Sequence, residues 1–384
     1  MKTPANIAAL RQRLQGLPAT THARERTQTL TQLAMDCARA GLLREGLDAV
    51  KEASRLAQAN GLDLEHAEAM SAASLCHYFR GDHMMAIASG LDAYQGFAAR
   101  NEWARMGHAL TPIAAACREI DAPDLSVNAL EGCLTIATKL GDRFLEARTR
   151  NTMGVVLGDI GRFDEAESHF HASRACLQET DQASYLPKVI ANLGSLNRKR
   201  ADAALSQGDV AAVMPLLQQG IGLLQQGLDA AEDHGNAYEA ADKLCSMSEL
   251  YFLLEDRVKA RDFAVRAREL GQLLKHQQIV IESGLVLGRI EMAEGRLEQA
   301  ERELRTVLET ARAAEMKSLQ IEAHRRLCEC FAAMGRVRDA DAQAALEKEM
   351  RINLEAGNRE AQREVRMLWQ AYFSRHPLMD AVSD

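Results

Sequence analysis

The chain has 384 residues, of which 47% are hydrophobic, 26% are charged and only 4% are aromatic. Its seven prolines and few Val/Ile runs argue against a β-sandwich, a barrel or a parallel sheet, and they favour an all-α fold. The formal net charge of −8 comes from interspersed charges of both signs, so no basic surface for nucleic acid is expected.

The sequence contains neither a membrane-spanning run nor an N-terminal secretion signal. Residues 1–16 lack the apolar core and the cleavage site of a signal peptide, so we expect a cytoplasmic protein that does not bind membranes. None of the eight cysteines forms a CxxC pair, which favours buried fillers over a disulfide or a metal site. We therefore predict no metal ion and no cofactor.

A six-residue pattern, Gly-x-apolar-x-x-small, recurs along the chain. It is clearest in GRFDEA (161–166) and GRLEQA (295–300), and weaker copies lie between and around these. Successive copies are separated by 40, 40, 40, 47, 47, 40 and 40 residues, which indicates one repeated structural unit. The first residues of the copies are Gly41, Gly81, Asp121, Gly161, Gly208, Glu255, Gly295 and Gly335.

Each copy predicts a tight turn between a leading helix and a trailing helix. Seven places before most turns stands a small residue, such as Ala34 or Gly288, and Gly194 fills this role in the fifth repeat. Small residues mark places where two helix backbones approach closely, and glycine at the turn tolerates the left-handed backbone that ends a helix. No such pair can bury its apolar stripe alone, so neighbouring pairs must stack.

In chain order, we predict three regions. An N-terminal capping helix lies within 1–23, about eight helix-turn-helix repeats occupy 24–350, and a C-terminal helix and tail occupy 351–384. The fifth repeat, about 182–236, carries seven extra residues in each helix, which adds about 10 Å to both arms of one hairpin. Either the longer hairpin is selected for a function or it reflects neutral drift.

Residues 151–170, NTMGVVLGDIGRFDEAESHF, resemble a tetratricopeptide repeat (TPR). The 40-residue period resembles the arrays of bacterial MalT-type regulators, quorum-sensing peptide receptors and diguanylate-cyclase-associated sensors. The resemblance implies a right-handed superhelical solenoid that binds other proteins. The matching residues are Met153, Gly154, Leu157, Gly161, Phe163, Ala166 and Phe170.

In TPR arrays the leading helices line a concave groove, and the resemblance places a polar stripe of this chain there. Asparagines such as Asn151 and Asn192 would hold a peptide backbone, because an amide offers both donor and acceptor. Nearby cations favour an acidic partner, although they could instead pair with Asp159 and Glu167. The candidate partner-binding residues are Arg148, Asn151, Lys188, Asn192, Ser195, Arg198, Lys199 and Tyr78, and the stripe continues through Glu282, Arg289, Glu322, Arg325, Arg326 and Glu329.

The sequence contains no phosphate-binding loop, no zinc-protease motif and no nucleophile motif, so we expect no enzyme. The preferred hypothesis is a scaffold or regulator that grips a peptide or helix of a partner protein. The alternative is a ligand- or peptide-sensing module that controls a separate signalling or transcriptional output protein.

The C-terminal segment is amphipathic and allows two interpretations. It either caps the last repeat through apolar residues or offers a surface to another chain, for example in a homodimer. The apolar residues predicted for capping are Leu354, Met367, Leu368, Tyr372 and Phe373.

Overall fold

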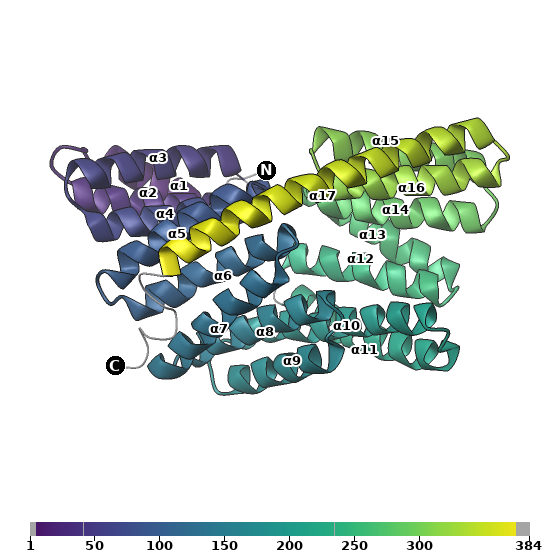
Figure 1. The fold of residues 1–384 in the computed structure, drawn as a ribbon, viewed down its shortest axis with the longest axis horizontal. Coiled ribbons are helices and arrows are strands. Elements are labelled where there is room, and N and C mark those ends of the chain that lie inside the picture. The colour runs from purple at the N-terminus through teal and green to yellow at the C-terminus, as the bar shows by residue number, and fades with distance from the viewer. Residues whose placement is uncertain (1–4, 41, 234, 374–384) are drawn as a thin grey trace. The chain divides into compact units, whose positions relative to one another are not determined.

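The computed structural model describes residues 5–40, 42–233 and 235–373, and within these ranges the chain is helical with no strand (Figure 1). The predicted all-α fold of helix-turn-helix repeats is confirmed. The helices are α1 (Ala5–Gln15), α2 (Ala23–Arg39), α3 (Leu43–Ala59), α4 (Asp63–Arg80), α5 (His83–Ala98), α6 (Trp103–Glu119), α7 (Pro123–Leu140), α8 (Arg143–Asp159), α9 (Phe163–Gln178), the 3-10 helix η1 (Ala183–Tyr185), α10 (Leu186–Ser206), α11 (Val210–Asp233), α12 (Ala237–Leu253), α13 (Arg257–Leu274), α14 (Gln277–Ala293), α15 (Leu297–Ala313), α16 (Lys317–Ala333) and α17 (Val337–Phe373).

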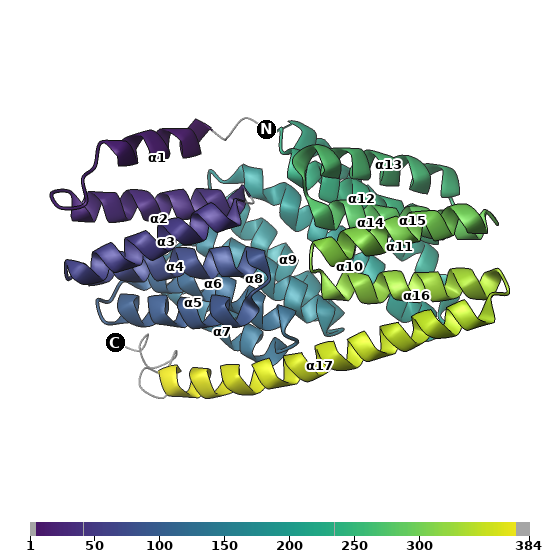
Figure 2. The same ribbon diagram turned by 90° about the horizontal axis from the view of Figure 1, so that it is seen from above.

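The chain forms two compact units. The first comprises residues up to Val156 together with residues from Asn358 on, and the second runs from Leu157 to Gly357. Within each unit, consecutive helices pack side by side, so that every repeat buries its apolar stripe against its neighbours (Figure 2). The predicted division at 23/24 and 350/351 stays a prediction.

The predicted turns have the expected left-handed backbone. At the seven described positions, φ lies between 58° at Asp121 and 85° at Gly81, while Gly41 lies outside the described residues. Six of the turns that join one repeat to the next are also left-handed, which the sequence pattern did not reveal, whereas the connection from α9 to α10 runs through η1. They centre on Gly61, Asn101, Gly141, Gly235, Lys275 and Glu315.

The small residues of the leading helices mark close helix contacts, as predicted. A Cβ atom on Gly194 of α10 would lie 2.9 Å from the carbonyl oxygen of Gly220 in α11. On Gly288 of α14, a Cβ atom would lie 2.6 Å from a methyl carbon of Leu304 in α15. The fifth repeat has a longer trailing helix than the repeats beside it: α11 has 24 residues, whereas the trailing helices α3, α5, α7, α9, α13 and α15 have 16 to 18.

The C-terminal segment does not cap the last repeat, so that interpretation was wrong for the residues from Asn358 on. Helix α17 continues through 350–351 without a break (Figure 2), and its last part belongs to the first compact unit. There the Gln362 side-chain amide donates hydrogen bonds to the carbonyl oxygens of Ile120 (2.9 Å) and Asp121 (2.8 Å), at the turn between α6 and α7.

The buried apolar face of this segment is formed by two residues that were not among those predicted for capping. Val365 is fully buried and Trp369 is 9% exposed, whereas Met367, which was expected to cap, is 65% exposed. The Tyr372 hydroxyl donates a hydrogen bond to Asp92 of α5. The physical reason for the difference is that Val365 and Trp369 lie four residues apart on one helix face, which packs against the first unit. The predicted homodimer through this helix stays a prediction.

None of the helices in the described ranges combines the length and the apolar character needed to cross a membrane.

Candidate functional site

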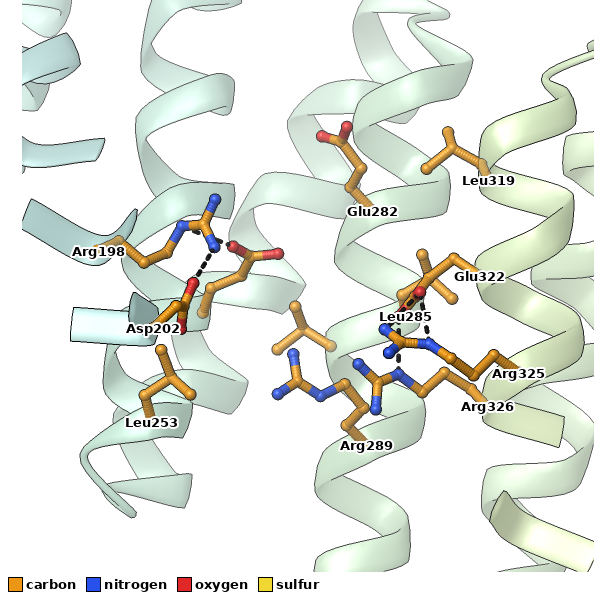
Figure 3. Close-up of a pocket in the computed structure, with 12 residues that line it drawn as sticks. Arg198, Asp202, Leu253, Glu282, Leu285, Arg289, Leu319, Glu322, Arg325 and Arg326 are labelled. Atoms are coloured by element: carbon orange, nitrogen blue, oxygen red, sulfur yellow. Dashed lines mark hydrogen bonds and ion pairs between the residues drawn. The ribbon is translucent and has the colours of Figure 1, made fainter. Parts of the chain in front are cut away.

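A pocket of about 510 Å³ lies in the second compact unit, between the leading helices of four consecutive repeats (Figure 3). Helices α10, α12, α14 and α16 each contribute to its wall. The lining combines four arginines, four carboxylates and four aliphatic residues: Arg198, Asp202, Glu249, Leu253, Glu282, Leu285, Val286, Arg289, Leu319, Glu322, Arg325 and Arg326.

The repeat itself brings these residues together. Glu249 and Arg289 occupy the same place in successive 40-residue repeats, and so do Glu282 and Glu322. Residues at equivalent places of stacked repeats face the same side of the array. Along α14, Glu282, Leu285 and Arg289 follow at steps of three and four residues, which keeps them on one helix face.

Most of the positive charge in the pocket is neutralised by ion pairs. On α10, the Arg198 guanidinium lies 3.0 Å from Asp202 and 3.4 Å from Glu249 of α12. On α16, Glu322 accepts from both Arg325 (2.6 Å) and Arg326 (2.8 Å). These two clusters form opposite walls of the pocket (Figure 3).

Arg289 differs from the other three arginines. Its guanidinium lies over the ring of Phe252, 4.2 Å from the ring centroid, and no carboxylate among the described residues forms an ion pair with it. Burial, followed by the nearby charge of Arg326, lowers the pKa of Arg289. The pocket therefore presents one partly buried positive charge that is not compensated at contact distance.

Glu282 is the corresponding carboxylate on the same helix. The Gln278 side-chain amide donates a hydrogen bond of 2.9 Å to it, and no cation among the described residues lies within ion-pair distance. Burial raises the pKa of Glu282 to about 7, and the nearby carboxylates Glu249 and Asp242 act in the same direction. At neutral pH this side chain is poised between its charged and neutral forms.

The raised pKa of Glu282 predicts a pH-dependent stability difference for Glu282→Gln. A raised folded-state pKa means that stability is fully present below about pH 4.5 and falls as pH rises through about 7. The variant lacks this loss, so at pH 8 its free energy of unfolding should exceed that of the wild type by on the order of 1–2 kcal/mol, after discounting for solvent screening. Urea unfolding at pH 4.5 and pH 8 measures the difference.

A matched control for this prediction is Glu309→Gln, at an exposed position of α15. We expect no pH-dependent difference between this variant and the wild type. If Glu282→Gln is no more stable than the wild type at pH 8, the ionised form of Glu282 does not destabilise the fold.

The residues chosen from the sequence fall into both compact units. Tyr78, Arg148 and Asn151 belong to the first unit, whereas the five residues of α10 belong to the second, and only Arg198 among them lines the pocket. These candidate binding residues remain a prediction.

In the first unit, the candidate residues contact aromatic rings or are enclosed. Tyr78 packs edge-on against Phe79, with ring centroids 5.5 Å apart, and Arg148 lies over Phe144 at 5.8 Å. Asn151 is only 2% exposed, so its amide is enclosed by neighbouring groups rather than presented to solvent.

On α10, the alternative interpretation, in which the cations pair with carboxylates, holds for two of the three candidate cations, and Arg198 pairs with Asp202 and Glu249. Lys199 forms an ion pair with Asp159, as that alternative proposed. Lys188 is exposed and lies 6.0 Å from the ring centroid of Tyr185, while Asn192 and Ser195 are partly buried.

The pocket lies closer to the C-terminal end of the repeat array than the main site predicted from the sequence. Glu282, Arg289, Glu322, Arg325 and Arg326 were expected in the groove stripe, and the structure brings them into one pocket, whereas Glu329 of the same stripe is not part of the lining and pairs with Arg326 (2.9 Å). Six lining residues were missed: Asp202, Glu249, Leu253, Leu285, Val286 and Leu319. The 40-residue step from Arg289 back to Glu249 was a signal that could have identified one of them.

No protein-family model and no curated protein matches the sequence. Solved structures do match at the level of fold. The chain is 13% identical to a Rap protein complexed with competence and sporulation factor, with a TM-score of 0.59, and the match covers 89% of this chain and 100% of the Rap chain. The apo form of the quorum sensor NprR from B. thuringiensis matches with 12% identity and a TM-score of 0.61, over 84% of this chain and 87% of that one.

A third similar structure is the Rap conjugation gene regulator of the plasmid pLS20 in complex with the Phr* peptide. It is 12% identical, with a TM-score of 0.57, and the match covers 95% of this chain and 96% of the regulator. At such low identity the likeness concerns the fold alone. The chain has the TPR-type helical-repeat fold of these proteins.

Proposed function

We propose that this chain is a non-enzymatic regulator that binds a short peptide in the pocket between α10, α12, α14 and α16 and thereby controls a separate output protein. The observation that carries the proposal is the pocket itself, which one face of four successive leading helices lines with both charges and aliphatic side chains. This favours the peptide-sensing hypothesis over a passive scaffold.

The chemistry of the lining suits a peptide. An extended main chain offers N–H donors and C=O acceptors, which carboxylates and guanidiniums can engage. Leu253, Leu285, Val286 and Leu319 provide apolar surface for peptide side chains.

The structural neighbours support the same class of ligand. One Rap protein was solved with competence and sporulation factor, another with the Phr* peptide, and NprR is described as a quorum sensor. We further propose that Lys188, Asn192 and Ser195 on α10 contact an acidic segment of the peptide or of the output protein, and that the protein acts in the cytoplasm.

Filling the pocket tests this proposal. Equilibrium dialysis against a degenerate mixture of three- to five-residue peptides, followed by mass spectrometry, measures the retained fraction. Leu253→Trp should lower retention at least about tenfold, because the indole occupies the pocket. Leu273→Trp, at a 72% exposed position outside the pocket, is the matched control and should retain peptides as the wild type does.

Two outcomes of this experiment count against peptide binding in the pocket. They are the absence of any peptide retained by the wild type, and equal retention by Leu253→Trp. A regulator should also change conformation when it binds, because a ligand shifts a population only through differential affinity. Small-angle scattering with a retained peptide should therefore show an altered radius of gyration, whereas a passive scaffold should show none.

A further inference from the structure

We propose that the pocket selects short peptides with two free ends, binding the C-terminal carboxylate at Arg289 and the N-terminal ammonium at Glu282. This inference rests on the proposed function and specifies the ligand class. It follows from which charged groups of the pocket already have partners and which do not.

Arg289 is the group that an anion would engage. The other three arginines of the pocket are held by Asp202, Glu249 and Glu322, so an incoming carboxylate would have to compete with those pairs. Arg289 lies over the face of Phe252 and forms no ion pair among the described residues, although Glu249 and Glu322 are close enough to raise its pKa, so the hydrogen-bond donors at the edge of its guanidinium can engage a ligand. A carboxylate there would gain charge-assisted hydrogen bonds at a partly buried site without breaking an existing pair.

Glu282 is the group that a cation would engage. Among the described residues its hydrogen-bond donor is the neutral amide of Gln278, and the negative charges of Glu249 and Asp242 near it outweigh the positive charge of Arg198. An ammonium group would supply the missing positive charge and offset the cost of holding this carboxylate ionised. A second anionic group on the ligand would instead be repelled here.

The spacing of the two residues sets the length of the ligand. Glu282 and Arg289 are seven residues apart on α14, which corresponds to about 10 Å along the helix axis. Figure 3 shows them at opposite ends of the pocket-facing stretch of that helix. An extended peptide of three residues spans about 10 Å, so the two ends of a tripeptide or slightly longer peptide reach both groups.

A segment within a longer partner protein does not satisfy this arrangement. Its main chain carries no charge at either end, so Arg289 and Glu282 would both remain without a charged partner unless side chains happened to supply one. The inference therefore separates a free peptide signal from an internal loop or helix of another protein.

Blocking one peptide end at a time tests the inference in the wild-type protein. The same degenerate mixture of three- to five-residue peptides is prepared with free ends, with an amidated C-terminus, and with an acetylated N-terminus. At pH 8, each block should lower the retained fraction at least about tenfold, the usual value of a hydrogen bond to a charged group.

Variants then show which residue of the pocket binds each end of the peptide. In Arg289→Gln, the free and the amidated peptides should be retained equally weakly, while acetylation should still matter. In Glu282→Gln, the effect of acetylation should vanish while that of amidation remains. Arg305→Gln on α15, which removes an arginine paired with Glu301 (2.8 Å) outside the pocket lining, should leave both discriminations in place.

The outcomes distinguish the inference from the proposed function. Equal retention of free, amidated and acetylated peptides by the wild type would overturn the two-ended selection and leave peptide binding in place. Retention of none of the three mixtures would overturn both.

Discussion

A Gly194→Val variant should unfold at a lower urea concentration than the wild type, with the free energy of unfolding of the second compact unit reduced by about 2–3 kcal/mol. The new side chain would begin 2.9 Å from the Gly220 carbonyl oxygen and 2.9 Å from Leu224, so α10 and α11 must move apart. Backbone atoms cannot rotate away as a flexible side chain can. Hydrogen exchange of the α10 and α11 amides in increasing urea isolates this unit from the rest of the chain.

Gly222 provides the control for this prediction. It lies on α11, and a Cβ atom there would meet nothing within 4 Å. Gly222→Ala should therefore leave the stability unchanged or raise it by up to about 1 kcal/mol, because alanine is the better helix former. If Gly194→Val were as stable as the wild type, the close crossing of α10 and α11 would be refuted.

A Trp369→Ala variant should lower the free energy of unfolding of the first compact unit by about 3 kcal/mol. Trp369 is 9% exposed and lies one helical turn from the fully buried Val365, on the part of α17 that bonds to Ile120 and Asp121. Removing the indole opens a cavity at this contact. Hydrogen exchange of the α5, α6 and α7 amides measures the loss of stability.

The control for this contact is Met367→Ala on the same helix, at a position that is 65% exposed, and its effect should stay within about 0.5 kcal/mol. The measurement also separates an intramolecular contact from a homodimer. An intramolecular contact gives the same stability loss at every protein concentration, whereas a loss that grows with concentration indicates a dimer interface.

The periodic part of the fold could be predicted from the sequence, because turn spacing and helix contacts are local. The left-handed turns at Gly161 and Gly295, and the close contact at Gly288, follow from single residues and their intervals. The packing of Trp369 could not be predicted in the same way. It depends on a contact between residues 242 positions apart, Gln362 with Ile120, and no repeat encodes that contact.

The site was predicted in part for a related reason. The repeat phase places Glu282, Arg289 and Glu322 on one face, and this was enough to put them in the groove stripe. Which cations have partners depends on side-chain conformations and neighbouring helices. The sequence therefore could not distinguish Arg289, which lacks an ion pair among the described residues, from Arg198, which pairs with Asp202 and Glu249.

The turns described above carry glycine at some repeats and a larger residue at others, and φ is positive in every case. Asp121, Glu255, Lys275 and Glu315 adopt φ between 56° and 61°, at a steric cost of about 1–2 kcal/mol each. Replacing glycine at one turn thus has a small energetic cost. Inserting or deleting residues in one helix of a repeat, in contrast, shifts every later contact of that helix by a fraction of a helical turn. The spacing between turns is consequently conserved more easily than the identity of the turn residues. Counting this spacing can identify a helical-repeat array even when the consensus residues have been replaced.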